Sequence, residues 1–119
     1  MNTILITKNN NEAIYIGRPS ILKNPFPTKP SKFSTLTYSH SESMKMFLKY
    51  ITNKYKTDLE FNKYLNDLME IDNLSFSCFC IHKKFTLIDF KNFNINNVIC
   101  HGEIISYFLF KISYSNTSN

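Results

Sequence analysis

The alternation of hydrophobic and polar positions predicts β-strands in three parts of the chain. Residues 3–7 and 13–16 are short runs rich in isoleucine, and the asparagine-rich turn between them predicts that the two form an N-terminal β-hairpin. Residues 74–80 place alternate side chains on opposite faces, which indicates a further strand. Residues 85–90 fit either a short strand or an ordered insertion.

Helical spacing of apolar residues predicts the helices. Ser39 and Glu42 form the pattern of a capping box before one apolar stripe, and Thr57 and Glu60 form the same pattern before a second. The last helix is expected over residues 102–112. It is apolar on nearly every side, so we expect it to be buried between two layers.

The order of these elements predicts a small α/β protein. Two strands, a long loop, two helices, a strand and a final helix suit a single-domain sandwich with a mixed sheet and about three helices, of Rossmann-like type. Residues 1–113 are expected to form this domain, and residues 114–119 a frayed polar tail.

Composition limits where the protein is expected to act. The 119 residues, of which 43% are hydrophobic and 19% charged, are enough for one folded domain without disulfides or a bound metal. No apolar run approaches the roughly 20 residues of a membrane span, no signal-peptide pattern follows Met1, and the three cysteines are an odd number. We therefore expect a cytoplasmic protein, in the host cytoplasm if it is viral, with no membrane partner.

The net charge of +5 favours an anionic partner. The lysines that carry most of this charge are dispersed along the chain, and no nucleic-acid-binding motif is present. Duplex nucleic acid is therefore not expected as a partner. Assembly into a homo-oligomer is left open.

Residues that are scarce in the chain gather in the segment 17–38. This segment holds all four prolines, one of the two glycines (Gly17) and the only arginine, Arg18. A planar guanidinium suits phosphate or carboxylate, and Ser20 and Asn24 add neutral hydrogen-bonding groups. Ligands of open α/β sheets bind where the chain leaves a strand, which makes this segment a candidate site. The alternative is that Arg18 makes a salt bridge and the prolines only stiffen a surface loop.

A second group of candidate residues combines cysteines with a histidine. Cys78 and Cys80 lie two residues apart in a predicted strand, so both side chains point to one face. Cys100 and His101 lie at the start of the last helix, where the partial positive charge attracts anions and lowers the pKa of a thiol. We expect His101 and Gly102 to contact a ligand there.

Three chemical roles are open for this second group. A zinc site would use the four ligands Cys78, Cys80, Cys100 and His101. A single residue between the first two cysteines is fewer than zinc pairs usually have, so no metal is expected. Cys100 could instead be a nucleophile with His101 or His82 as its base. For Cys78 and Cys80 the favoured interpretation is that of small, buried hydrophobic side chains.

The two groups together resemble a known family, domain of unknown function 4326. Its members carry YIGR-x-S and then G-N-P-F near the N-terminus, and C-W-C and then C-H-G near the C-terminus. The present chain has YIGRPS at 15–20, NPF at 24–26, CFC at 78–80 and CHG at 100–102. The resemblance spans residues from about 13 to 110.

The chain departs from this pattern at a few positions. Lys23 stands in place of a glycine and Phe79 in place of the tryptophan, and residues 81–99 form a longer link than is usual. An arginine near the start of the first helix is not evident, and His40 is the nearest polar residue. The resemblance implies a compact α/β domain whose motifs meet in space, and a frequent setting in bacteria, phage and mobile elements. It implies no activity.

We expect the protein to bind a nucleotide-like or phosphorylated small ligand. Arg18 and the helix amides at Gly102 would hold the anion, and Tyr15, Phe26 or Phe79 would stack on a base or ribose. The expected ligand contacts are Gly17, Arg18, Ser20, Asn24, Phe26, His101 and Gly102. In a virus or phage, such a protein would sequester a host nucleotide.

Two other functions are consistent with the same residues. An enzyme acting on a similar ligand would use His101, Cys100 or Glu103 for acid–base or nucleophilic chemistry. A structural interaction domain would use the cysteines and His101 as a zinc site that stabilises the fold.

Overall fold

The computed structural model describes residues 3–8, 10–30, 36–78 and 80–117. These residues form a four-stranded mixed sheet and four α-helices, which confirms the predicted α/β class. The elements in chain order are β1 (Thr3–Thr7), β2 (Ile14–Tyr15), α1 (His40–Thr57), α2 (Leu59–Met69), β3 (Ser75–Ser77), β4 (Lys83–Thr86), α3 (Leu87–Lys91), the 3₁₀ helix η1 (Ile95–Asn97) and α4 (His101–Thr117).

The strands follow the order β2-β3-β1-β4 across the sheet. β3 pairs in parallel with both β1 and β2, and β4 pairs antiparallel with β1. The predicted hairpin is therefore wrong, because β3 lies between β1 and β2. An asparagine-rich turn permits a hairpin but does not enforce it. Pairing on both sides of β3 places Ile6 and Ile14 beside Phe76, whose side chain is fully buried.

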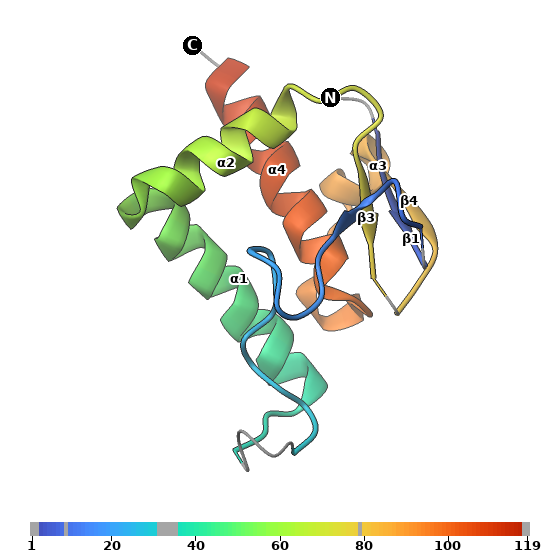
Figure 1. Cartoon of the computed structure of the whole chain (residues 1–119), viewed down its shortest axis with the longest axis vertical. Coiled ribbons are helices and arrows are strands. Elements are labelled where there is room, and N and C mark those ends of the chain that lie inside the picture. Colours follow the sequence, from blue (N-terminus) through green and yellow to red (C-terminus); the bar gives the residue numbers. More distant parts are fainter. Residues whose placement is uncertain (1–2, 9, 31–35, 79, 118–119) are drawn as a thin grey trace.

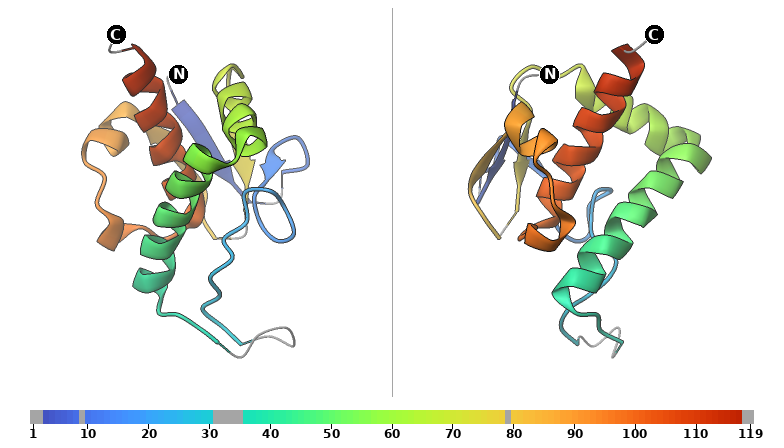
Figure 2. Two further views of the ribbon diagram at one scale, coloured as in Figure 1. Left: turned by 90° about the vertical axis from the view of Figure 1, so that its left-hand side faces the viewer. Right: turned by 180° about the vertical axis from the view of Figure 1, so that it is seen from behind.

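The helices cover one face of the sheet in two successive layers (Figures 1 and 2). α4 lies next to the sheet, and α1 and α2 pack on its other side. Ile104, Phe108 and Leu109 of α4 are each at most 3% exposed. The burial expected for the last helix is thus confirmed. No helix in the described ranges has both the length and the apolar character needed to cross a bilayer.

Gly102 lies in the first turn of α4, close to the sheet. A Cβ atom at this position would lie 3.0 Å from Cδ1 of Ile16 and 3.3 Å from Cγ2 of Ile6. Both isoleucines are completely buried. The absence of a side chain at Gly102 therefore allows the first turn of the helix to pack directly on the sheet.

The helix starts show how local hydrogen bonds define the elements. Ser39 and Glu42 form the predicted capping box of α1. α2 begins one residue later than predicted, because Asp58 rather than Thr57 accepts the hydrogen bond from the Phe61 amide. Thr57 still belongs to α1, so the single residue Asp58 ends one helix and begins the next.

Three boundaries differ from those predicted. β3 covers only Ser75–Ser77, so both Cys78 and Cys80 lie beyond its end. The segment predicted as a strand or an insertion divides into β4 and α3. α4 continues to Thr117, and the ring of Tyr114 stacks on Phe90 and Phe110 with centroids 5.7 and 6.3 Å apart. These aromatic contacts explain why the helix extends beyond residue 112.

We predict that Leu109→Ala destabilises the protein by about 2–5 kcal/mol, because it opens a cavity between the sheet and the outer helices. Ser115→Ala is the control on the same helix, since Ser115 is exposed and its loss should change stability by less than about 0.5 kcal/mol. Urea denaturation of both variants checks the prediction. Equal stabilities for the two variants would contradict the central position of α4.

Candidate functional site

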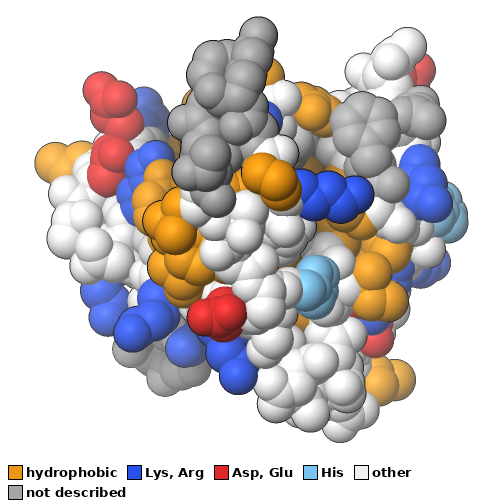
Figure 3. All heavy atoms as spheres, turned by 90° about the horizontal axis from the view of Figure 1, so that it is seen from below, with side chains coloured by type: hydrophobic (Ala, Val, Ile, Leu, Met, Phe, Trp, Pro, Cys, Tyr) orange, Lys and Arg blue, Asp and Glu red, His pale blue; other side chains and the backbone are white. Residues whose placement is uncertain are grey.

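A cleft of about 230 Å³ opens beyond the carboxyl ends of β2 and β3. Its lining includes Arg18 and Phe26 from the loop after β2, His40 from the start of α1, and Cys80 and His101 from the C-terminal half of the chain. The two motif regions therefore meet in space, as the resemblance implied. Seen from the end of the molecule that lies lowest in Figure 1, basic and histidine side chains lie beside hydrophobic ones (Figure 3).

In the loop after β2, the guanidinium of Arg18 is held by an uncharged carbonyl oxygen. Nε and Nη2 of Arg18 donate to the carbonyl oxygen of Asn24 at 3.2 and 2.9 Å, and the hydroxyl of Tyr15 donates to the carbonyl of Arg18 at 3.0 Å. The peptide bond between Arg18 and Pro19 is cis. The salt bridges found among the described residues involve Lys83 and not Arg18. The guanidinium of Arg18 is thus held in one orientation, while its positive charge is not neutralised by a carboxylate of the described residues.

Asn24 positions the loop rather than pointing a free amide into the cleft. Its Nδ2 donates to Oγ of Ser43 at 2.8 Å, and its Oδ1 accepts from the amide of Phe26 at 3.0 Å. Oγ of Ser43, fully buried in α1, donates in turn to the carbonyl of Phe26 at 2.6 Å. This closed set of hydrogen bonds fastens the NPF segment to the helix. The edge-to-face contacts of the Phe26 ring with Tyr38 and Tyr50 fix its orientation further.

Ser43 lines the cleft and was not singled out from the sequence. It lies four residues before Phe47, on the apolar stripe of α1, where a polar side chain needs a hydrogen-bond partner. A serine inside an apolar stripe was the signal in the sequence. It was missed because the stripe was identified from its apolar residues alone.

His101 ties the start of α4 to the end of β2. Its Nε2 lies 2.7 Å from the carbonyl oxygen of Ile16, and since a carbonyl only accepts, Nε2 carries the hydrogen. Burial lowers the pKa of His101 and is the largest effect. The hydrogen bond to Ile16 raises this pKa, and the charge of Arg18 lowers it. The ring also packs edge-on against Phe47 at 5.4 Å. His101 is therefore a neutral imidazole beside a permanent cation.

His40 makes a similar connection at the other side of the cleft. Its Nε2 lies 2.7 Å from the carbonyl oxygen of Val98, which joins the start of α1 to the segment before α4. The two histidines thus fix the walls of the cleft relative to one another.

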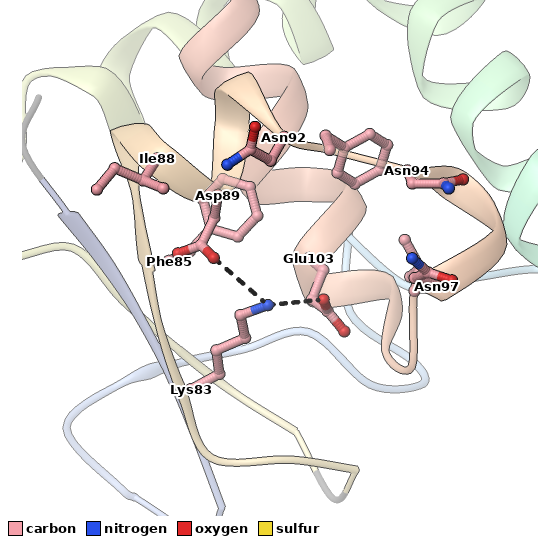
Figure 4. Close-up of a pocket in the computed structure, with 10 residues that line it drawn as sticks. Lys83, Phe85, Ile88, Asp89, Asn92, Asn94, Asn97 and Glu103 are labelled. Carbon is pink, nitrogen blue, oxygen red and sulfur yellow. Dashed lines mark hydrogen bonds and ion pairs between the residues drawn. The ribbon is translucent and has the colours of Figure 1, made fainter.

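Glu103 caps α4 and faces away from the cleft. Its Oε1 accepts from the amides of Ile99 and Cys100 at 2.9 and 3.1 Å, and its Oε2 lies 3.2 Å from Nζ of Lys83. This side of Glu103 faces a second cavity, of about 130 Å³. In it, Lys83 lies between Glu103 and Asp89 (Figure 4). Glu103 and His101, two of the residues considered for acid–base or nucleophilic chemistry, thus line different cavities.

Several predicted ligand contacts lie outside the lining of the cleft. Gly17 packs beneath the ring of Tyr15, with which a Cβ atom would collide. Oγ of Ser20 is buried and has no hydrogen-bond partner among the described residues. Gly102 packs on the sheet, and its amide donates to Sγ of Cys100 at 3.4 Å. Phe79 lies outside the residues that the structure describes.

The three cysteines converge although β3 ends before them. Their Sγ atoms all lie within 4.8 Å of one another, and those of Cys78 and Cys100 are 3.2 Å apart. Cys78 is buried as predicted, whereas Cys80 is exposed, because the chain turns after β3 and carries Cys80 to the surface of the cleft. Of the four residues considered for zinc, His101 does not join this cluster.

Cys100 lacks the surroundings of an activated nucleophile. Burial raises the pKa of its thiol well above the usual range, so the thiol is protonated. Its neighbours within hydrogen-bond distance are Cys78 and the amide of Gly102, while His82 faces Oγ1 of Thr7 at 3.3 Å. A general base is thus missing from the described surroundings of this sulfur.

Comparison with known proteins identifies a family. The family model described as Domain of unknown function (DUF4326) matches residues 5–111, a range that contains all the motifs of the cleft. No curated protein and no solved structure matches the chain.

We predict that Ser43→Ala destabilises the protein by about 1–3 kcal/mol, because it leaves the amide of Asn24 and the carbonyl of Phe26 without their buried partner. Ser41→Ala makes the same chemical change on the exposed side of α1 and should leave stability nearly unchanged. Thermal unfolding of both variants measures the difference. A Ser43→Ala protein as stable as its control would exclude the positioning role.

Proposed function

The chain belongs to the DUF4326 family, and we propose that it is a binding domain for a small phosphorylated, nucleotide-like ligand held in the 230 Å³ cleft. The observation that carries this proposal is the charge of the cleft. Arg18 contributes a permanent positive charge to it, and the described lining contains no aspartate or glutamate. An anion entering the cleft therefore meets attraction without a competing carboxylate.

The geometry of Arg18 supports recognition of a phosphate. Nε and Nη2 are engaged by the carbonyl of Asn24, so the plane of the guanidinium is set before a ligand arrives. Nη1 has no hydrogen-bond partner among the described residues and remains available to donate. Preorganised, charge-assisted hydrogen bonds of this kind are about twice as strong as neutral ones.

The remaining lining supports a ligand with an apolar part. Phe26, Pro27 and Met44 contribute hydrophobic surface beside the arginine. A volume of about 230 Å³ is below the roughly 300 Å³ at which pockets for drug-sized molecules begin. The cleft thus suits a ligand no larger than a nucleoside monophosphate rather than a dinucleotide.

The position of the cleft supports the same proposal. β1, β2 and β3 are parallel, so their carboxyl ends share one edge of the sheet, and the chain leaves β2 towards Arg18 and β3 towards Cys80. Rossmann-like sheets bind their ligands beyond this edge. We propose that the sheet of this chain does the same.

Binding without turnover is the function that the geometry favours. Glu103 serves as the cap of α4, His101 is bonded to Ile16, and Cys100 has a protonated thiol. Glu103 and His101 thus have structural tasks, and Cys100 lacks the thiolate form of a nucleophile. A domain that binds a nucleotide and does not convert it suits sequestration of the ligand in a phage or its host.

The proposal is tested by thermal shift and calorimetry with nucleoside monophosphates, their unphosphorylated nucleosides and inorganic phosphate. A monophosphate present at 100 times its Kd should stabilise the folded protein by about 2.7 kcal/mol. The matching nucleoside should give no shift, because it lacks the anion. Equal shifts with and without the phosphate, or none with any of these compounds, would overturn the proposal.

We predict that Arg18→Ala weakens binding of the monophosphate about 10- to 100-fold, the loss expected for charge-assisted hydrogen bonds. Lys23→Ala is the matched control, since it removes the same charge from the same loop at a residue outside the lining. Calorimetry on both variants separates a direct contact from a general effect of charge. If Arg18→Ala no longer unfolds cooperatively, the arginine is structural and the predicted contact is wrong.

A further inference from the structure

The cluster of three thiols has the spacing of a metal site. In tetrahedral coordination, a zinc ion with bonds of about 2.3 Å holds its sulfur ligands about 3.8 Å apart. The Sγ atoms of Cys78, Cys80 and Cys100 lie within 4.8 Å of one another, and those of Cys78 and Cys100 are 3.2 Å apart. One ion can therefore reach all three sulfurs with only small movements of the side chains.

We propose that Cys78, Cys80 and Cys100 bind one thiophilic divalent ion, such as zinc, through three thiolates, and that the fourth coordination position faces the cleft. This inference does not rest on the proposed function. It rests on the convergence of all three cysteines of the chain from two segments that are 20 or more residues apart in sequence.

The surroundings of Cys100 suit a thiolate that is bound to a metal. The residue immediately precedes α4, where the partial positive charge of the helix stabilises an anion. The amide of Gly102 donates to its Sγ at 3.4 Å, and hydrogen bonds of this kind orient metal ligands.

A bound metal ion would offset the free-energy cost of burying these sulfurs as thiolates. Cys78 and Cys100 are at most 3% exposed, and in the absence of a cation burial disfavours their charged forms. A divalent ion offsets this cost, because it binds the thiolates and releases their protons. The cluster is therefore expected to bind metal more tightly as the pH rises.

The fourth coordination position is open towards the ligand cleft. Within the part of the chain that the structure describes, no histidine, aspartate or glutamate joins the three cysteines. The Nε2 atom of His101 is held by the carbonyl of Ile16. Both Cys80 and Cys100 line the cleft, so a water molecule or an oxygen of a bound anion can complete the coordination. Three protein ligands leave one exchangeable position, unlike the four protein ligands of structural zinc sites.

The test is titration of the reduced, metal-free full chain with Co²⁺ and then Zn²⁺. We expect one Co²⁺ per chain, with the sulfur-to-metal charge-transfer absorption of thiolate ligands, and its displacement by one Zn²⁺. The chain has three cysteines in all, so this absorption can only report the proposed site. Absence of stoichiometric binding while the thiols are free, or a disulfide in the freshly isolated protein, would overturn the proposal.

Substitutions distinguish the three proposed metal ligands from nearby residues that do not bind the metal. Cys80→Ser is the decisive change, because Cys80 is exposed and its replacement should leave the fold intact. It should weaken Zn²⁺ binding roughly 100-fold or more, since loss of a direct ligand exceeds the 10- to 100-fold effect of outer contacts. His82→Ala controls for surface histidines and should bind Zn²⁺ like the unchanged chain. His101→Gln keeps a hydrogen-bond donor for the carbonyl of Ile16, and a loss in this variant as large as that in Cys80→Ser would contradict the open fourth position.

These experiments can refute the proposed metal site and the proposed anion site separately. A chain that binds the monophosphate but neither metal refutes the thiolate site alone. A chain that binds Co²⁺ through its thiolates but no phosphorylated compound refutes the proposed function alone.

Discussion

The hydrogen bond between Nε2 of His101 and the carbonyl of Ile16 is the contact on which the candidate site depends. It joins the end of β2 to the start of α4 across 85 residues of sequence, in surroundings where a free carbonyl would be costly. Gly102 makes the contact attainable, because a side chain there would push the helix away from Ile16. Where this bond forms, the loop that carries Arg18 and the segment that carries Cys100 share one cleft.

Most polar groups around this cleft are used to hold the walls together. Asn24 and Ser43 fasten the NPF segment to α1, and His40 and His101 connect the two helix starts to distant carbonyls. Once these bonds are formed, Arg18 is the charged group of the lining that retains an unused donor. Binding of an anion therefore has a specific position in the cleft, set by which groups the fold leaves available.

The thiolate site and the anion cleft are electrostatically compatible. A divalent ion held by three thiolates would have a net charge of about −1 with its ligands, yet its open coordination position still attracts an oxygen donor. Cys80 and Cys100 line the cleft that contains Arg18, so one ligand could reach both the metal and the guanidinium. Tight binding of a phosphorylated compound and retention of the metal would then support each other, as linked equilibria require.

The sequence by itself determined the α/β class, β1, the capping box at Ser39 and the buried character of α4, because local hydrogen bonds and apolar periodicity act over a few residues. It also singled out Arg18 and His101, which the structure places in the lining of one cleft. Only the tertiary structure decided that β2 pairs with β3, that Glu103 faces a second cavity and that the three thiols meet. These outcomes depend on which apolar surfaces, far apart in the sequence, pack against each other and exclude water. The pattern of residues within a short segment does not contain that information.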